Sequence, residues 1–296
     1  MGAPADQGDQ PRERGPKSAM IFPMVQEIRF ETDEALFRQS GFETYAHFMA
    51  PDTGTHVARK RGRVVRRLDL EGRSFFLKRN RFHWIEFFKG LLHMRFLPRN
   101  GLREWRNIDL VTRAGIPTVR RVAWGERRCL SREISSFTIT EKLYGARSLK
   151  EILQERAAGK ADAGSFREKR DLIQRVARLA SRLHRHGLYH QDFYLGHIYK
   201  GPDEVLYLID LQRVLCSPLA SRRYRIKDLA QIHYSAMEIP GISASDRLRF
   251  LLAYTGSQRV GREEREMIQK ILAKTGRIAR HTVKLLERRR RRKEIP

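Results

Sequence analysis

The sequence has little cysteine and few acidic residues relative to its basic ones. Only Cys129 and Cys216 occur among 296 residues, so no cysteine cluster indicates a metal site or a disulfide framework. A reducing cytosol is the simplest compartment for such a chain. Sixty lysines and arginines stand against 34 acidic residues, leaving a formal net charge of +26. This surplus predicts an anionic partner: nucleic acid, an acidic membrane surface or a phosphorylated glycolipid.

Long apolar segments are also missing. No stretch approaches the ~20 uncharged apolar residues that a membrane-spanning helix needs, and the N-terminus has no apolar signal core. We therefore expect a soluble or peripheral protein on the cytoplasmic side of a membrane. Residues 1–17 are rich in Gly, Pro, Asp, Gln and Arg and have almost no large apolar side chains. We predict that they form a disordered tail.

The most informative stretch runs from Gly187 to Arg213 and carries two acids, Asp192 and Asp210. Residues 198–200 and 205–209 predict two strands, which a Gly-Pro-Asp turn joins into a hairpin. A hairpin returns the chain to the end from which it started. We therefore expect both carboxylates, and the histidine that precedes the first strand, to converge in one cleft.

Two carboxylates in one cleft suit phosphoryl transfer from a nucleotide. One accepts the proton of the attacking hydroxyl, and the other, with a polar neighbour, holds Mg²⁺ on the phosphates. A single aspartate beside a hairpin is commonly a turn or capping residue. Two at this spacing, with upstream partners, favour the catalytic interpretation.

The spacing resembles the catalytic core of the protein-kinase-like fold. His190 and Asp192 match its His-x-Asp loop, Asp210 matches its metal-binding acid, and His197 stands where that fold has Asn. An imidazole is a poorer Mg²⁺ ligand than an amide oxygen, because hard cations prefer oxygen. This substitution argues against a generic protein kinase.

One branch of that superfamily accounts for the departures. The motif His-x-Asp-x-Tyr-x-x-His spans His190–His197, and Ile-Asp-Leu-x-Arg spans Ile209–Arg213. Together they resemble the bacterial lipopolysaccharide kinase family of Kdo and inner-core heptose kinases, and Tyr194 with His197 is more similar to the heptose kinases. The resemblance covers roughly residues 42–254. It implies an α+β, bilobal protein-kinase-like fold, with a small antiparallel β-sheet lobe bearing one main helix and a larger, mostly helical lobe.

On this basis the chain divides into four parts. We expect a disordered tail over 1–17, a small nucleotide-binding lobe over 18–143, a large helical lobe over 144–283 and a basic tail over 284–296. For the small lobe, the sequence predicts five strands, at 55–59, 64–70, 74–79, 118–124 and 136–141. In the large lobe, a helix over 165–186 stops at Gly187, and we expect His184 near its end to be a surface residue or a partner of the helix dipole, and not a catalyst.

A lysine and a glutamate are expected to meet in the small lobe. Strand alternation places Lys78 on the same face as Phe76, towards a covered surface. Glu104 shares a helical stripe with Ile108 and Val111. A lone strand lysine is more often solvated, and a glutamate on such a stripe more often lies at its border. The resemblance implies a phosphate-binding Lys78 held by a helix acid, so we predict an ion pair between Lys78 and Glu104.

Two further regions admit two interpretations each. No Gly-x-Gly-x-x-Gly loop is present, and the basic turn over 59–63 either contacts phosphate or is an ordinary exposed turn. The segment 81–99 interleaves aromatic and aliphatic residues with cations and has one acid, Glu86. It suits a membrane interface, and it equally suits packing on the small lobe.

The leading hypothesis is an ATP-dependent kinase that uses Mg²⁺ to phosphorylate a heptose hydroxyl of the lipopolysaccharide inner core. The acceptor would be a lipid A–core glycolipid at the anionic cytoplasmic face of a Gram-negative inner membrane, and a nucleic-acid partner is not expected. The resemblance implies that Asp192 is the catalytic aspartate and that His190 braces its loop. It implies a nucleotide site made of Lys78, Glu104 and the hinge at Glu141, and a metal site made of Asp210 and His197. It also implies a structural acid in a later helix, Asp228.

Two alternatives stay open at the level of sequence. A kinase-like enzyme acting on a protein or a small molecule shares every nucleotide-site residue. A non-catalytic adaptor with a degraded kinase fold would use its basic surface to bind nucleic acid or membrane.

Overall fold

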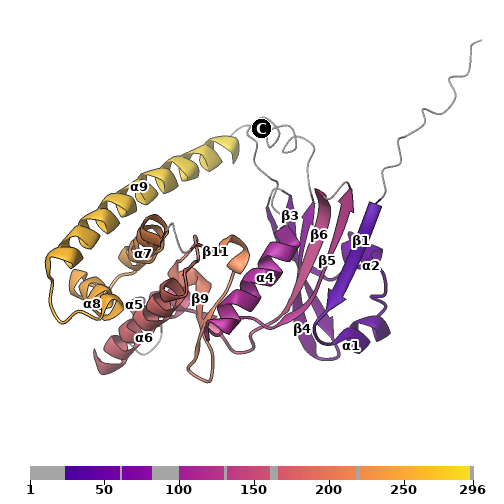
Figure 1. Cartoon of the computed structure of the whole chain (residues 1–296), viewed down its shortest axis with the longest axis horizontal. Helices are drawn as coiled ribbons and strands as arrows, with labels where there is room; N and C mark the ends of the chain where they lie inside the picture. The colour runs from indigo at the N-terminus through magenta and orange to yellow at the C-terminus, as the bar shows by residue number, and fades with distance from the viewer. Residues whose placement is uncertain are drawn as a thin grey trace, which may run out of the picture.

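The computed structural model describes residues 24–60, 62–81, 100–129, 132–160, 166–217 and 221–293. They form two lobes, a β-sheet lobe built from the N-terminal part of the chain and a helical lobe built from the C-terminal part (Figure 1). The bilobal α+β architecture expected from the sequence is therefore confirmed. The predicted disordered tail over 1–17 and the aromatic, basic segment over 82–99 lie outside the described residues.

The small lobe is built on one antiparallel sheet with six strands, in the order β1-β5-β6-β4-β3-β2. The strands are β1 (Met24–Phe30), β2 (Thr55–Lys60), β3 (Arg63–Leu70), β4 (Arg73–Arg81), β5 (Arg121–Cys129) and β6 (Arg132–Glu141). The prediction of five strands was wrong, because β1 was missed. Met24 and Val25 are about half exposed at the sheet edge, so β1 is fixed by backbone pairing with β5 and lacks the apolar alternation that marks a strand.

One face of the sheet carries an aromatic core beneath two short helices, α1 (Glu34–Gln39) and α2 (Tyr45–Met49). Phe37, Phe48 and Phe137 are fully buried there, and the rings of Phe48 and Phe137 stack with centroids 4.5 Å apart. Gly125 of β5 makes this packing possible, since a Cβ at that position would lie 2.5 Å from the Phe137 ring. The small lobe thus has its own hydrophobic core.

Helix α4 (Asn100–Arg113) lies against the opposite face of the sheet and joins the lobes. Trp105 packs near Trp124 of β5, while Ile108 and Val111 belong to the core of the large lobe. The helix ends before Gly115, whose φ of 67° is the left-handed conformation that commonly stops helices. This position aims the middle of α4, including Glu104, at the boundary between the lobes.

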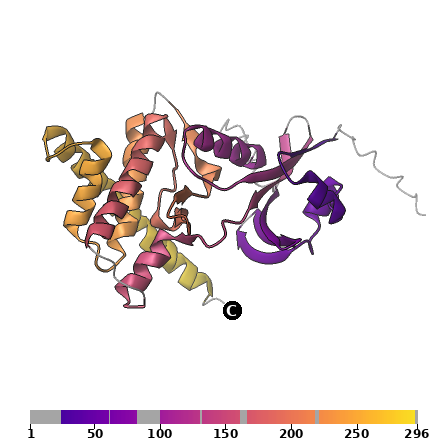
Figure 2. The same cartoon turned by 90° about the horizontal axis from the view of Figure 1, so that it is seen from below.

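The large lobe packs its helices against one another (Figure 2). Its core is formed mainly by aliphatic side chains. Its helices are α5 (Leu149–Ala157), α6 (Phe166–Arg185), α7 (Ser221–Met237), α8 (Ala244–Thr255) and α9 (Arg262–Lys293). Short strands and 3-10 turns carry the loops that face the small lobe, namely β7 (Arg147–Ser148), β8 (Leu188–Tyr189), η1 (Leu195–His197), β9 (Ile198–Lys200), β10 (Leu206–Leu208), η2 (Leu211–Arg213) and β11 (Leu215–Cys216). Strands β9 and β10 pair as the predicted hairpin.

Two features of the large lobe differ from, or extend, the sequence-based description. His184 is 4 % exposed, so its predicted surface position was wrong; its ring bonds Asp228 and Tyr254, which come from distant helices. Residues 284–293, within the predicted basic tail, continue α9 without a break. Within the described ranges, no helix has the length and apolar character to cross a membrane.

Candidate active site

A cleft of about 450 Å³ lies between the lobes, a volume typical of nucleotide and small-ligand sites. Sheet residues Lys78 and Glu141 line it from the small lobe, and His197 and Asp210 line it from the large lobe. The other predicted site residues surround this set. Glu104 and His190 lie behind the surface, while Asp192 is joined to the cleft through His197.

The predicted ion pair is present on the small-lobe side. Lys78 Nζ of β4 contacts Glu104 Oε1 of α4, and the two side chains are 14 % and 1 % exposed. Strand alternation and helix register place these groups on facing surfaces, as expected from local geometry. Because a buried carboxylate without a cation is strongly unfavourable, the pair holds Lys78 at the wall of the cleft.

Arg63, at the start of β3, reaches across the cleft. Its Nη2 lies 3.8 Å from Glu104 Oε2, its Nη1 lies 3.8 Å from Asp210 Oδ1, and Nη1 also contacts Gln212 Oε1. Arg63 Nε and Glu104 Oε2 are buried and make no hydrogen bond within the described part of the chain. Arg63 therefore retains one donor, and Glu104 one acceptor, that no described residue satisfies.

Helix α7 anchors the catalytic loop by its backbone. Asp228, which is fully buried, accepts the N–H groups of His190 (2.7 Å) and Gln191 (2.8 Å), as predicted for its bracing role. Gln231 Oε1 accepts the N–H of Phe193 at 3.0 Å, and Ser235 Oγ accepts that of Leu195 at 3.1 Å. These three acceptors lie at i, i+3 and i+7, on one face of the helix.

His190 is fully buried and ties the two aspartate segments together. Its Nε2 lies 2.9 Å from the carbonyl of Ile209, and its Nδ1 accepts the N–H of Asp192 at 3.3 Å. This pairing requires a neutral ring with the proton on Nε2. Burial lowers the pKa of His190, which favours the same neutral form.

The carboxylate of Asp192 contacts the guanidinium of Arg213, a contact that the sequence does not predict. Arg213 Nη1 lies 2.9 Å from Asp192 Oδ1 and 3.0 Å from Oδ2, while the Arg213 side chain is 60 % exposed. The guanidinium is held by the short turn η2, which the backbone enters at Asp210 with φ 58° and ψ 55°. This left-handed conformation is uncommon for residues other than glycine. It turns the chain sharply between Asp210, the acid expected to bind metal, and Arg213.

The residues expected to hold Mg²⁺ lie side by side. His197 Nδ1 lies 2.7 Å from the carbonyl oxygen of Asp192 and donates to it, which leaves the lone pair of Nε2 directed elsewhere; Nε2 lies 3.9 Å from Asp210 Oδ2. Burial alone raises the pKa of Asp210, but Lys78, Arg63 and His197 together outweigh burial. The pKa is therefore lowered overall, and the carboxylate is ionised. No cluster of three or more ligand residues occurs within the described ranges. The donor set fits an ion bound mainly by nucleotide phosphates and water.

The hinge at Glu141 carries a ring of charges on its outer side. Arg73 bonds Asp33 (2.8 Å) and Glu141 (2.7 Å), and Arg120 bonds the same two acids, each at 2.5 Å. Burial raises the pKa values of both acids, but the two arginines lower them overall. The carboxylate of Glu141 is therefore engaged by two arginines of the scaffold.

Several functional contacts were beyond sequence reasoning. Asn107 of α4 is buried and donates to the carbonyls of Leu211 and Val214, which fixes η2. The polar spacing of Asp228, Gln231 and Ser235 on α7 was the available signal for the loop anchor. No sequence signal pointed to the Arg213 contact, because it depends on the turn made at η2.

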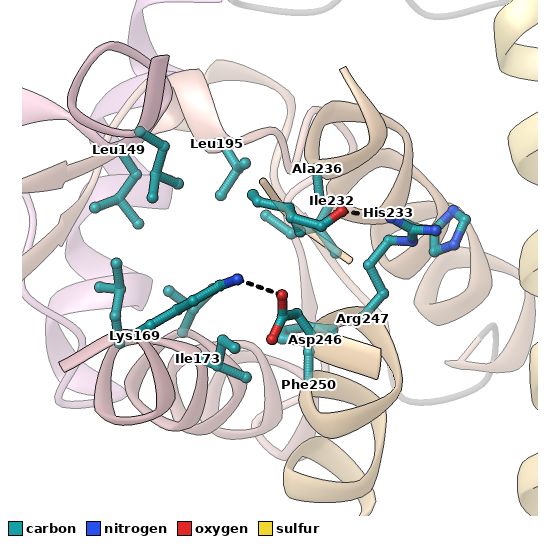
Figure 3. Close-up of a pocket in the computed structure, with 14 residues that line it drawn as sticks. Leu149, Lys169, Ile173, Leu195, Ile232, His233, Ala236, Asp246, Arg247 and Phe250 are labelled. Atoms are coloured by element: carbon teal, nitrogen blue, oxygen red, sulfur yellow. Dashed lines mark hydrogen bonds and ion pairs between the residues drawn. The ribbon is translucent and has the colours of Figure 1, made fainter. Parts of the chain in front are cut away.

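A second cavity, of about 90 Å³, lies within the large lobe (Figure 3). Its wall is mostly aliphatic, with Leu149, Ile173 and Leu195 among its lining residues. Lys169 and Asp246 form an ion pair there at 2.5 Å. Burial alone raises the pKa of Asp246, but Lys169 and Ser243 lower it to about 2.

Comparisons with known proteins agree on one family. The sequence model described as the lipopolysaccharide kinase (Kdo/WaaP) family matches residues 56–254. The chain is 33 % identical over 201 residues to the lipopolysaccharide core heptose(I) kinase WaaP of Pseudomonas aeruginosa, covering 65 % of this chain and 74 % of that protein. It is 32 % identical over 228 residues to an Escherichia coli protein of the same name, covering 74 % and 84 %. A solved structure of WaaP in complex with acyl carrier protein has a TM-score of 0.66 and 28 % identity, covering 86 % of this chain and 98 % of that one.

Proposed function

Because the chain belongs to the lipopolysaccharide kinase (Kdo/WaaP) family, and is therefore a phosphotransferase acting on a sugar hydroxyl, we propose that it transfers the γ-phosphate of ATP to a heptose of the lipopolysaccharide inner core. The observation that carries this proposal is one continuous site. Lys78 and Asp210 line the cleft, and His197 links that cleft to the backbone of Asp192.

Asp192 acts on the acceptor in this proposal. Its carboxylate orients the heptose hydroxyl and accepts its proton as the oxygen attacks the γ-phosphorus, while the bond from that phosphorus to the β,γ-bridging oxygen breaks and ADP leaves. His190 is a positioning residue, since it holds the Asp192 amide through Nδ1 and is kept neutral by burial. Arg213 contacts Asp192, and the approaching hydroxyl would share this carboxylate with it.

The nucleotide occupies the cleft. Lys78, held by Glu104, binds the phosphates, and Arg63 adds charge where a glycine-rich loop is lacking. Asp210 and His197 would hold Mg²⁺, which supplies charge neutralisation of the phosphates when bound. Leu143 also lines the cleft, and its backbone amide makes no hydrogen bond to another described residue. It is the hinge group that we assign to the adenine edge.

The acceptor side is cationic, which suits a phosphorylated glycolipid. Lys227 of α7 is half-buried, and its Nζ donates to Gln191 Oε1 at 2.9 Å. Burial lowers the pKa of Lys227, and Arg213 lowers it further. An anionic ligand would stabilise the charged form of this desolvated ammonium, which lies beside a second cation. We place the enzyme at the cytoplasmic face of a Gram-negative inner membrane, where such an acceptor is presented.

The test is transfer of labelled γ-phosphate from Mg·ATP to purified lipid A–core glycolipid, with matched acceptors that contain or lack heptose. We expect label only on the heptose-containing acceptor, and a loss of at least roughly 100-fold in the Asp192→Ala variant. The variant's circular dichroism and melting temperature should match those of the wild type. Equal labelling of both acceptors would contradict the heptose assignment, and undiminished transfer by Asp192→Ala would contradict the mechanism.

A second partner is favoured by the relative solved in complex with acyl carrier protein. We propose that this chain also binds an acyl carrier protein, with the apolar cavity of Figure 3 receiving the start of the acyl chain. Ala236 lines this cavity, so Ala236→Phe should fill it. We expect that variant to lose preference for acylated over unacylated carrier in a binding titration. Preference equal to that of wild type would rule the cavity out.

A further inference from the structure

Helix α9 packs against α7 along one apolar stripe. Ile271 is 6 % exposed and Thr275 is 5 % exposed, and the hydroxyl of Thr275 bonds the Ala230 carbonyl of α7. Nearer the start of both helices, Arg222 Nη2 on α7 lies 3.5 Å from Glu266 Oε2 on α9, and further along the side chains of Tyr234 and Thr282 lie close together. The two helices therefore run in the same direction.

This stripe continues after its partner ends. Helix α7 stops at Met237, whereas α9 extends to Lys293, and the last turns of α9 pass beyond α7 in both views (Figures 1 and 2). Leu286 lies at i+4 from Thr282 and i+11 from Thr275, on the same helical face, yet it is 51 % exposed. Met237 is 54 % exposed, Val283 is 53 % exposed and Leu285 is 39 % exposed.

Basic side chains occur on the same turns of α9 as these apolar ones. Lys284, Arg288 and Arg290 are exposed on the same turns of α9, in a sequence that carries five consecutive arginines over 288–292. Glu287 is the one acid among residues 283–293. We name Met237, Val283, Leu285, Leu286 and these three cations the α7–α9 patch.

The patch lies on the side of the large lobe that holds the catalytic loop. Gln231 Nε2 bonds the Tyr194 hydroxyl at 3.2 Å and the Gln191 carbonyl at 2.9 Å. Tyr234, which contacts α9, is about one helical turn beyond Gln231. A short path of contacts thus leads from the loop of Asp192 to the exposed end of α9.

We propose that the α7–α9 patch binds a membrane surface rich in anionic lipid and so presents the catalytic loop to an acceptor anchored in that membrane. Aliphatic side chains enter the headgroup boundary while lysines and arginines meet lipid phosphates. A convex helix end suits a fluid, planar interface, which requires no complementary groove, better than it suits an acidic protein. The purpose of the contact rests on the proposed function, but the binding itself does not.

The first experiment is flotation of the full chain with neutral phosphatidylcholine vesicles and with vesicles containing phosphatidylglycerol. Wild type should float only with the anionic vesicles. The double variant Leu285→Ser, Leu286→Ser should lose roughly tenfold or more in vesicle affinity. The matched control is Leu272→Ser, which is also 51 % exposed on α9 but lies outside the patch, and it should bind like wild type. Unchanged binding by the double variant would overturn the proposal.

A charge pair of variants isolates the electrostatic part. Arg288→Ser with Arg290→Ser should weaken anionic-vesicle binding and reduce its salt dependence. Arg277→Ser with Arg280→Ser removes two exposed cations from the same helix outside the patch, and should have the smaller effect. An equal loss in both pairs would indicate diffuse attraction by net charge and would overturn the assignment to the patch.

Activity separates this inference from the proposed function. The Leu285→Ser, Leu286→Ser variant should phosphorylate a soluble, deacylated core acceptor as well as wild type does, while losing activity towards glycolipid embedded in vesicles. If wild type phosphorylates neither acceptor, the proposed function fails and vesicle binding still decides the present inference. If the variant loses binding to acyl carrier protein but not to vesicles, the patch is a protein-docking surface and the membrane assignment is wrong.

Discussion

The catalytic loop and the cationic wall of the small lobe differ in how completely their polar groups are paired. Every backbone N–H from His190 to Leu195 has an acceptor, supplied by α7 side chains or by the loop itself. On the opposite wall, Arg63 Nε and Glu104 Oε2 are buried with no hydrogen bond to another described residue, and the same holds for the side-chain Nε2 of Gln191 in the loop. The contrast is therefore between the loop backbone, which is fully paired, and the side chains of the wall, where Arg63 can still donate to an anionic ligand and Glu104 Oε2 can only accept.

This difference fits the two tasks of a kinase. In the proposed function, the loop that carries Asp192 has to hold the general base in place before the sugar substrate arrives, because a misplaced catalytic group lowers the rate steeply. In the same proposal, the cations that face the phosphates contribute most to nucleotide affinity if their strongest hydrogen bonds form only with the nucleotide. A buried polar group without a partner is unfavourable, so binding that supplies the partner is favoured.

The largest effect is expected at the anchor of the loop. Asp228→Asn keeps the shape of a fully buried side chain but replaces one accepting oxygen with a donor that faces backbone N–H groups. We expect the free energy of unfolding to fall by about 3 kcal/mol in urea titrations. Asp171→Asn, 55 % exposed on α6, is the control and should change it by less than about 0.5 kcal/mol. If the free energy of unfolding falls no more in Asp228→Asn than in Asp171→Asn, the loop anchor contributes little to stability.

Nucleotide should act on the other wall. Mg·ATP at 100 times its dissociation constant should raise the free energy of unfolding by about 2.7 kcal/mol. In hydrogen exchange, we expect added protection in β3, β4 and α4, and little change at 190–195, which is already hydrogen-bonded. AMP, which lacks the outer phosphates, is the control ligand. Protection confined to the catalytic loop would reverse the contrast.

A paired carboxylate outside both regions sharpens the comparison. Asp246 is 4 % exposed and has a pKa of about 2, because its bonds to Lys169 and Ser243 outweigh the effect of burial. A lowered pKa stabilises the fold above the unfolded value near 4, and this stabilisation disappears as pH falls through about 2. Asp246→Asn should therefore lose about 2 kcal/mol at pH 7. The difference from wild type should shrink below pH 4 in urea titrations.

The control for that experiment is Glu266→Gln, whose side chain is 47 % exposed. It should change stability little at either pH. A pH-independent deficit in Asp246→Asn would show that packing, and not the ionised carboxylate, stabilises this position.

The smallest effect is expected at Arg63. Arg63→Gln should weaken Mg·ATP binding roughly tenfold, or about 1.4 kcal/mol, while the unfolding free energy of the unliganded protein changes less than that. Arg59→Gln removes an exposed cation from the same hairpin turn and should leave binding near wild type. Equal weakening in both variants would mean that the turn acts through general charge, and no weakening would remove Arg63 from the phosphate site.

Local periodicity accounts for what could be predicted. Strand alternation at Lys78 and helical spacing at Glu104 each specify a face, so their meeting follows once the two elements pack. The hairpin between Asp192 and Asp210 is likewise a local feature. The bilobal architecture was available from the motifs and has been confirmed, whereas the roles of these residues stay predictions.

What could not be predicted depends on partners distant in sequence. His184 looks like a surface residue at a helix end, but Asp228 and Tyr254 come from other helices to bury it. Gln231 and Ser235 share a polar helical spacing with Asp228, but the sequence does not show that their partner is the backbone of a distant loop. Strand β1 was missed because an edge strand needs only backbone pairing.

The ring of Asp33, Arg73, Arg120 and Glu141 has a mechanical consequence. It clamps the entry to α1, strand β4, the start of β5 and the end of β6 to one another, and the Lys142 amide adds a bond to the Ser74 carbonyl. In the proposed function, closure of the lobes on a nucleotide would therefore move these strands as one rigid body. Residues 143–146, where Gly145 has a φ of 65°, form one connection between the lobes, and a second runs through Thr118, whose hydroxyl bonds the Leu208 carbonyl.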